Sequence, residues 1–359
     1  MFKTYEKYIF KNFINKFLII TLIFFSLIII LSVLEEISFF KNTDVNFMFP
    51  YLITILGAPI TLFEIFPFIF LISTQFLFYD LFKKDELTLL KTSGLNNFKI
   101  IKILFLISFF IGIFAVLFFY NAASKLKFYY TDIKNEYTKD NKYLAVVTDS
   151  GLWLKDEINN YTLIVKANYI QNDYLMSVVI NKFNNKFELE EVIQSKKINI
   201  KNELWEIENP IITKKNITSN NEKILFFKTN FNKKKIRSLF SNISTLNLIE
   251  LFDLKKDYDN LGYSSKEIQI HLLNLFSTPI FYAALTVLSS IIMFNLNKNR
   301  SLFFHIIFGV FMSVIIYYIN FIFNSLGNNE KISAMASIFI PLIAISILTG
   351  IGLIKINEK

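Results

Sequence analysis

The chain offers few side chains for catalysis. It has no cysteine and only two histidines, His271 and His305, so neither a cysteine site nor a histidine metal cluster is expected within one chain. It contains no G-x-x-x-x-G-K-[ST] phosphate loop, no G-x-S-x-G nucleophile turn and no H-E-x-x-H zinc motif. We therefore expect no enzymatic activity, cofactor or metal. Any work must draw its energy from a gradient or from a partner ATPase.

One short charged segment, Phe82–Phe98, stands between two long apolar runs. Asp85 and Glu86 suit the start of a helix, Lys91 suits its last turn, and Gly94 suits the position just after it. A helix this short is marginal alone because nucleation is costly, so it must dock on lipid headgroups or on a second protein. The alternative is a solvated loop with a frayed turn. The apolar side chains of the segment are Leu87, Leu89 and Leu90.

The composition places most of the chain in a membrane. Of 359 residues 53% are hydrophobic, and 42 are phenylalanine. Lys125–Lys266, in contrast, is polar and rich in asparagine and lysine. The net charge of +9 is better explained by membrane topology than by nucleic acid, so no nucleic-acid partner is predicted.

Apolar stretches long enough to cross a bilayer occur three times on each side of the polar region. They are Phe17–Leu34, Leu52–Leu81, Ile100–Tyr120, Ile268–Phe294, Leu302–Phe323 and Ile332–Ile354. Asn121–Ser124 is expected to end the third span. Glu64 in the second span is either an intramembrane functional acid or an interfacial one.

The distribution of lysine and arginine predicts the orientation. Nearly all of these residues in short segments fall in Met1–Lys16, Phe82–Lys102, Asn295–Arg300 and Lys355–Lys359. Positively charged short loops stay in the cytoplasm, so both termini are predicted to be cytoplasmic. The polar region then lies outside, and Phe82–Phe98 belongs to the largest internal loop.

The polar region alternates short apolar runs with turn formers, which is typical of an antiparallel sandwich, jelly roll or open barrel. The predicted strands are Tyr143–Val147, Trp153–Leu154, Tyr161–Ile170, Tyr174–Ile180, Phe187–Val192, Ile198–Ile200, Leu204–Ile207 and Ile224–Phe227. Trp153 and Trp205 are assigned to core or edge packing, and Leu246–Leu254 to a helix. The predicted domains are residues 1–120 and 267–359, two membrane halves of three spans, and residues 121–266, the β domain.

Several stretches, in order along nearly the whole chain, resemble the LptF/LptG (YjgP/YjgQ) family of lipopolysaccharide export permeases. Glu64-x-x-Pro67 resembles a signature of the second span, and Asp85–Gly94 resembles E-L-x-x-[LM]-x-x-x-G. Gly151–Asp156 resembles the G-L-W-x-[KR]-D opening of the β domain in the LptG branch, and Leu204–Ile207 resembles a W-x-L strand. Leu248–Leu251, Gly262 and Pro279 also fall where the family has a helix before the fourth span and a kink within it.

This resemblance implies a permease subunit of an ABC transporter that extracts lipopolysaccharide from the inner membrane and passes it to a periplasmic bridge. It implies a periplasmic jelly-roll domain, a heterodimer with a sister LptF-like permease, a cytoplasmic LptB-like ATPase dimer, and LptC/LptA-like bridge proteins. Residues 85–94 would be the ATPase-coupling helix. The first and fifth spans would line a cavity for lipopolysaccharide and membrane lipid, which makes Phe24, Ile28, Phe311 and Ile315 candidates.

The chain departs from the family where the first span ends. Family members often carry lysines there that meet lipid phosphates, but Ser32–Phe40 holds Glu35 and Glu36 and no basic residue. The remaining candidates are Lys41, Lys125 and Lys127, whose alternative is an ordinary solvated lysine. A second hypothesis for the whole chain is a membrane-anchored periplasmic binding or scaffold protein of envelope assembly.

Overall fold

The computed structural model divides the chain into two compact units, residues 1–127 with 266–359 and residues 128–265. It describes residues 3–41, 43–137, 152–158, 161–171, 173–214, 217–219, 223–240, 242–260, 263–294 and 302–357. The predicted strand Tyr143–Val147 and the predicted loop Asn295–Arg300 lie outside these residues.

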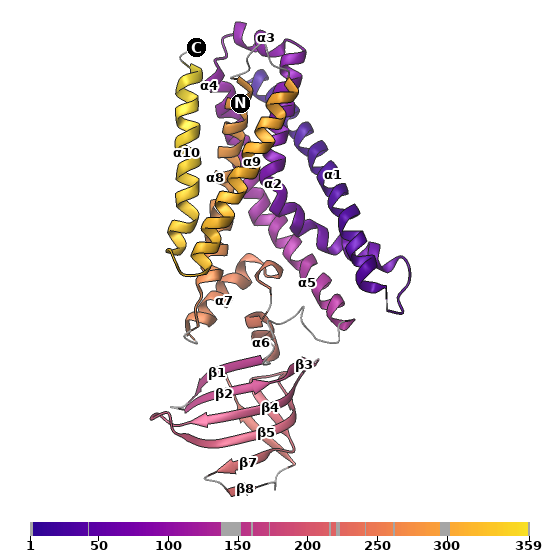
Figure 1. The fold of residues 1–359 in the computed structure, drawn as a ribbon, viewed down its shortest axis with the longest axis vertical. Helices are drawn as coiled ribbons and strands as arrows, with labels where there is room; N and C mark the ends of the chain where they lie inside the picture. Colours follow the sequence, from indigo (N-terminus) through magenta and orange to yellow (C-terminus); the bar gives the residue numbers. More distant parts are fainter. Residues whose placement is uncertain are drawn as a thin grey trace. The chain divides into compact units, whose positions relative to one another are not determined.

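The first unit is built from long apolar helices (Figure 1). The long helices are α1 (Thr4–Phe40), α2 (Phe49–Lys83), α4 (Asn97–Phe114), α8 (Lys266–Phe294), α9 (Leu302–Asn328) and α10 (Ala334–Asn357). The short helix α3 (Glu86–Thr92) lies between α2 and α4 in the chain. Among the described residues, six helices are long and apolar enough to cross a membrane, which confirms the six predicted spans.

The third span continues past its predicted end. A π-helical turn at Ala115–Tyr120 leads from α4 directly into α5 (Asn121–Glu136), so Asn121–Ser124 does not stop the helix. Two adjacent alanines favour helix, and the polar side chains find acceptors within it. Asn121 Nδ2 donates to the Leu117 carbonyl at 2.7 Å, and Ser124 Oγ to the Asn121 carbonyl at 3.2 Å. The prediction of a boundary here was therefore wrong.

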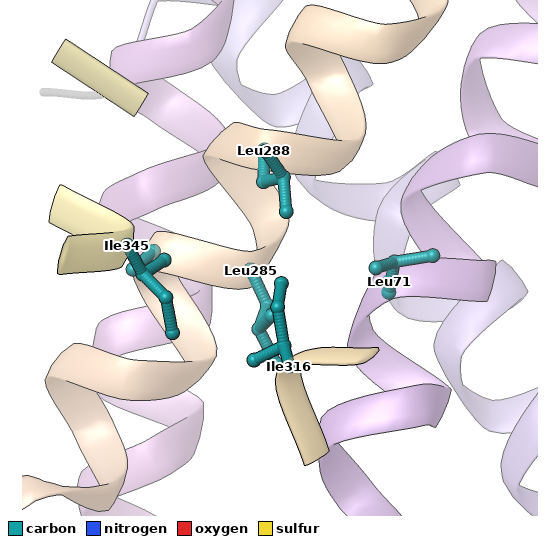
Figure 2. Close-up of a cluster of buried hydrophobic side chains, with 6 residues drawn as sticks. Leu71, Leu285, Leu288, Ile316 and Ile345 are labelled. Carbon is teal, nitrogen blue, oxygen red and sulfur yellow. The ribbon is translucent and has the colours of Figure 1, made fainter. Parts of the chain in front are cut away.

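The helix α8 is the centre of the membrane unit. It packs against α2, α4, α9 and α10, and 72% of its most apolar stretch is buried. Figure 2 shows the apolar cluster that joins four of these helices. Its members come from α2, α8, α9 and α10 and are Leu71, Ala284, Leu285, Leu288, Ile316 and Ile345.

Small and polar residues let the central helices approach closely. A Cβ at Gly112 of α4 would lie 2.7 Å from the Pro279 Cα of α8, so only glycine fits there.

Pro67 lacks an N–H and leaves the carbonyl of Phe63 without its helical donor. The hydroxyl of Tyr282 in α8 lies 3.4 Å from that carbonyl and donates to it. Neighbouring spans thus compensate for a proline within a membrane helix.

The second unit contains a nine-stranded antiparallel sheet, which confirms the predicted inserted all-β domain. The strands are β1 (Leu152–Ile158), β2 (Tyr161–Ala167), β3 (Tyr169–Gln171), β4 (Tyr174–Phe183), β5 (Leu189–Asn199), β6 (Leu204–Glu208), β7 (Ile211–Lys214), β8 (Ile217–Ser219) and β9 (Ile224–Lys228). The main path runs β1-β2-β4-β5-β6-β9, with β3 on β4, β7 on β5 and β8 on β7. Within the described part, β1 and β9 therefore each pair with one strand only.

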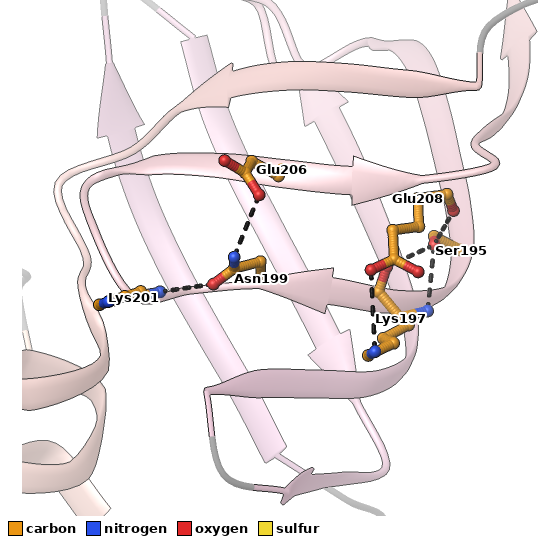
Figure 3. A network of polar contacts seen from close by, with 6 residues as sticks. All are labelled: Ser195, Lys197, Asn199, Lys201, Glu206 and Glu208. Carbon is orange, nitrogen blue, oxygen red and sulfur yellow. Dashed lines mark hydrogen bonds and ion pairs between the residues drawn. The ribbon is translucent and has the colours of Figure 1, made fainter.

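Polar side chains also join β5 to β6 (Figure 3). Asn199 Nδ2 donates to Glu206 Oε2 at 3.1 Å, and Ser195 Oγ donates to the Glu208 carbonyl at 2.6 Å. Lys197 and Glu208 form an ion pair at 3.8 Å. Two helices follow the sheet, α6 (Lys233–Phe240) and α7 (Leu248–Asn260). The predicted helix Leu246–Leu254 is α7, whereas the basic α6 was not predicted.

Candidate functional site

The short helix α3 has a well-defined C-terminal end. Gly94 adopts a φ of +87°, which L side chains rarely adopt. Its N–H donates to the Lys91 carbonyl at 3.0 Å, and the N–H of Leu95 donates to the Leu90 carbonyl at 3.1 Å. These two bonds form a Schellman motif, which satisfies the last carbonyls of the helix. The sequence prediction of Gly94 as the stop residue is therefore confirmed.

The N-terminal end of α3 differs from the prediction. Asp85 precedes the helix with a φ of 52°, and its side chain makes no capping hydrogen bond. The carboxylate of Glu86 instead accepts a hydrogen bond from the Tyr8 hydroxyl of α1, with 2.6 Å between the two oxygens. An ion pair between Lys16 and Asp80 joins α1 to α2 nearby. The start of α3 is thus held by α1 as well as by the end of α2.

The three leucines of α3 do not share one exposed face. Leu87 is buried, with 4% of its surface exposed, while Leu89 is 64% exposed and Leu90 is half-buried. Leu87 fixes the helix on its own chain. Leu89 is left as an apolar side chain on a helix held at both ends, and this combination is typical of a docking element.

The two spans with the smallest buried shares are α1 and α9. Only 22% of the most apolar stretch of α1 and 17% of that of α9 is buried, against 72% for α8. Phe311 of α9 is 61% exposed and Ile315 is 37% exposed, whereas Phe24 of α1 is half-buried. Ile28 is buried against its own chain at 6%. Three of the four cavity candidates therefore present apolar surface outward, and Ile28 does not.

The candidate phosphate-binding lysines differ in their surroundings. Lys41 caps the C-terminus of α1 and is exposed, as is Lys125 in α5. Lys127 is half-buried and lies close enough to Glu64 of α2 to interact with it electrostatically. Glu64 itself is exposed on the surface of α2. Lys41 and Lys125 therefore keep the more accessible charges.

A family model described as lipopolysaccharide export system permease LptF/LptG matches residues 7–355, which is nearly the whole chain. The chain belongs to this family. Among curated proteins, none matches it. The six spans and the family together make this LptF/LptG permease a multi-pass protein of the inner membrane and a component of lipopolysaccharide export. The family model does not separate the LptF branch from the LptG branch.

Two residues of the family motifs, Asp156 and Trp205, hold one segment of the β domain in place through hydrogen bonds. Asp156 of β1 is buried, and its carboxylate accepts hydrogen bonds from the Asn230 backbone N–H at 3.0 Å and from Asn230 Nδ2 at 2.8 Å. The indole N–H of the fully buried Trp205 donates to the Phe231 carbonyl at 2.8 Å. The segment Thr229–Phe231 leads from β9 into α6. The motif letters alone gave no sign of this shared structural role. Core or edge packing was predicted for Trp205, and its full burial confirms the first of these.

Proposed function

We propose that this permease is the membrane subunit of an ABC transporter and that α3 is the helix on which a partner ATPase acts. The proposal rests on one observation: Leu89 is an exposed apolar side chain on a short helix whose two ends are fixed. The sequence has no phosphate-binding loop, so ATP hydrolysis requires a second subunit. In this proposal Leu89 contacts the ATPase, an LptB-like dimer. The residues that shape and hold the helix are Asp85, Glu86, Leu87, Leu90 and Gly94.

The charge distribution supports an orientation in which α3 faces the cytoplasm. Both chain ends and α3 lie at the same end of the helical unit (Figure 1). Lys3, Lys7, Lys11 and Lys16 precede or begin the first span. Lys83 and Lys84 precede α3, and Lys91 lies in its last turn. Short loops rich in lysine remain cytoplasmic, so we place both termini in the cytoplasm and the β domain in the periplasm.

The outward faces of α1 and α9 support a lipid path between this chain and a second permease subunit. Exposed apolar residues such as Phe311 suit either acyl chains or a partner helix, and a heterodimer with an LptF-like sister would provide both. Lys41 follows the last residue of α1, and Lys125 lies in α5, the continuation of the third span. At either place an ammonium group suits a lipid phosphate as a point charge. ATPase closure would move α3 and, through the hydrogen bond between Glu86 and Tyr8, the N-terminal end of α1.

The open strands of the β domain support transfer to a periplasmic bridge. In the described part β1 and β9 each pair with one strand only, and a neighbouring sheet can add to such an edge through main-chain hydrogen bonds. On the open side of β1, Tyr263 and Asn230 already bind the Lys155 N–H and the Glu157 carbonyl, so β9 is the freer of the two. We propose that LptC/LptA-like proteins of the jelly-roll type join there and receive the lipid. The stretch before and within β1, G-L-W-L-K-D, favours the LptG-like branch for this chain.

Site-specific photo-crosslinking tests the lipid path. A photoreactive phenylalanine analogue at Phe311, in the intact complex in membranes, is expected to give an adduct with lipopolysaccharide because this side chain faces outward. The same analogue at buried Ile28 serves as the matched control and is expected to give little adduct. The absence of a lipopolysaccharide adduct at Phe311 and at Phe24 would favour the scaffold hypothesis and contradict the proposed path.

A further inference from the structure

A buried glutamine joins α2 to α9 inside the membrane unit. The side chain of Gln75 is fully buried, and its Nε2 donates to the His305 carbonyl of α9 at 3.1 Å. Its Oε1 has no hydrogen-bond partner among the described residues. An amide costs free energy when it is buried in an apolar surrounding without all its partners. A leucine would avoid that cost, so the position serves a contact that an apolar residue cannot make.

Gly309 of α9 makes room for this amide. A Cβ at position 309 would lie 1.8 Å from Gln75 Nε2 and 2.7 Å from its Cδ, so even alanine would displace the side chain or the helix. In an α-helix the carbonyl of residue 305 accepts the N–H of residue 309. The Gln75 amide thus adds a second donor to a carbonyl that is already part of the helical ladder, and the missing side chain gives it access.

This contact lies within the first two turns of a helix that is otherwise the most exposed span. The helix α9 begins at Leu302, and 17% of its most apolar stretch is buried. Further along, the rings of Tyr317 and Phe68 lie 5.6 Å apart, and Ile316 joins the apolar cluster of Figure 2. Apolar contacts of this kind allow α9 to shift along α2. The hydrogen bond from Gln75 is directional and has room only beside Gly309, so it fixes one register between the two helices.

We propose that Gln75 and Gly309 form a fulcrum that holds the beginning of α9 on α2 while the rest of α9 moves during lipid transport. The inference rests on the proposed function, in which α9 lines the lipid path. Gln75 acts through α9 and does not itself contact lipid, so it is a positioning residue. The contact is polar and lies within the membrane unit, where no water competes for the amide.

Substitution of these two residues, singly and together, tests the fulcrum in the intact complex reconstituted in vesicles that contain lipopolysaccharide. Gly309→Ala is expected to slow ATP-dependent lipopolysaccharide release about tenfold or more, because overpacking displaces α9. Gln75→Ala is expected to slow it less. In the double variant the methyl group that Gly309→Ala adds no longer collides with an amide at position 75. The double variant should therefore release lipopolysaccharide at the same rate as Gln75→Ala alone. Gly350→Ala in α10 is the matched control, since a Cβ there meets nothing within 4 Å.

The position of α9 supplies a readout that separates a fulcrum from a general loss of folding. The chain has no cysteine, so spin labels on cysteines at exposed Phe110 and Tyr318 report the distance between α4 and α9. Gly309→Ala should shift this distance, Gln75→Ala should broaden its distribution, and Gly350→Ala should leave it unchanged.

Three results would overturn the fulcrum. The first is a rate of lipopolysaccharide release by Gly309→Ala that equals the wild-type rate. The second is a slowing of release by Gly309→Ala that is the same with native Gln75 and with Gln75→Ala. The third is an α4–α9 distance that neither Gly309→Ala nor Gln75→Ala alters. Failure of the proposed function is separate, because it would appear in a chain with native Gln75 and Gly309 as the absence of a lipopolysaccharide adduct at both Phe311 and Phe24.

Discussion

Replacing Leu89 by aspartate is expected to reduce recovery of the partner ATPase with the permease at least about tenfold. Leu89 is 64% exposed in this chain, so the change leaves the helical unit folded. Burial of a leucine at an interface contributes roughly 1.5–3 kcal/mol, and an unpaired carboxylate placed there costs more. Since 1.4 kcal/mol corresponds to a factor of ten, the loss exceeds that factor. Co-purification from detergent-solubilised membranes measures it.

The neighbouring Thr88→Asp is the matched control for this prediction. Thr88 is also exposed on α3, so the variant adds the same charge one residue away on a different side of the helix. It should retain most of the ATPase. Equal recovery of the ATPase with the wild type and Leu89→Asp would contradict the role of this leucine, and equal loss with both variants would point to charge rather than to an apolar contact.

Replacing Asp156 by alanine is expected to destabilise the β domain by about 1.5–3 kcal/mol. The substitution removes the buried carboxylate that accepts both the backbone N–H and the side-chain amide of Asn230. The amide keeps one acceptor, the Glu157 carbonyl at 3.1 Å. Hydrogen bonds to a charged group contribute about 1.5–3 kcal/mol. Asn230 is exposed, so water can satisfy its backbone N–H in the variant and no further penalty is added. The segment that leads into α6 then loosens. Limited proteolysis of the full chain in detergent should cleave this variant faster near residue 230.

Glu157→Ala provides the comparison, because the Glu157 side chain is largely exposed and its ion pair with Lys155, at 2.8 Å, lies on the surface. Exposed pairs of this kind contribute little to stability. Its proteolysis pattern should match that of the wild type. A wild-type pattern for Asp156→Ala as well would show that the carboxylate does not hold the segment.

The sequence predicted the features that depend on local pattern. Runs of apolar residues long enough to cross a bilayer gave all six spans, and alternation with turn formers gave most of the strands. Gly94 was identified as the end of α3 because glycine is the residue that adopts a positive φ without strain. The strands β7 and β8 are short, and their neighbourhood in the chain is polar, so their pattern was too weak to distinguish from a loop.

The features that the sequence could not predict depend on contacts between distant residues. Leu87 and Leu89 are equivalent in the sequence, and only the packing of α3 on its own chain buries one and exposes the other. The Tyr8–Glu86 hydrogen bond joins residues 78 positions apart, so the role of Glu86 in holding α3 was not visible. Likewise, Gln75 and Gly309 become a pair only when α2 and α9 meet. The helix beyond Tyr120 was missed because its asparagine and serine are satisfied within the helix.

Photo-crosslinking from position 89 tests the central claim most directly, namely that α3 is the docking site of an ATPase. A photoreactive amino acid replaces Leu89 in the full chain, and cells are irradiated before their membranes are solubilised. The account predicts an adduct with a protein that carries a phosphate-binding loop, identified by mass spectrometry, and none from the same amino acid at exposed Ile217 in the β domain. An adduct with lipid alone, or no protein adduct from position 89, would contradict it.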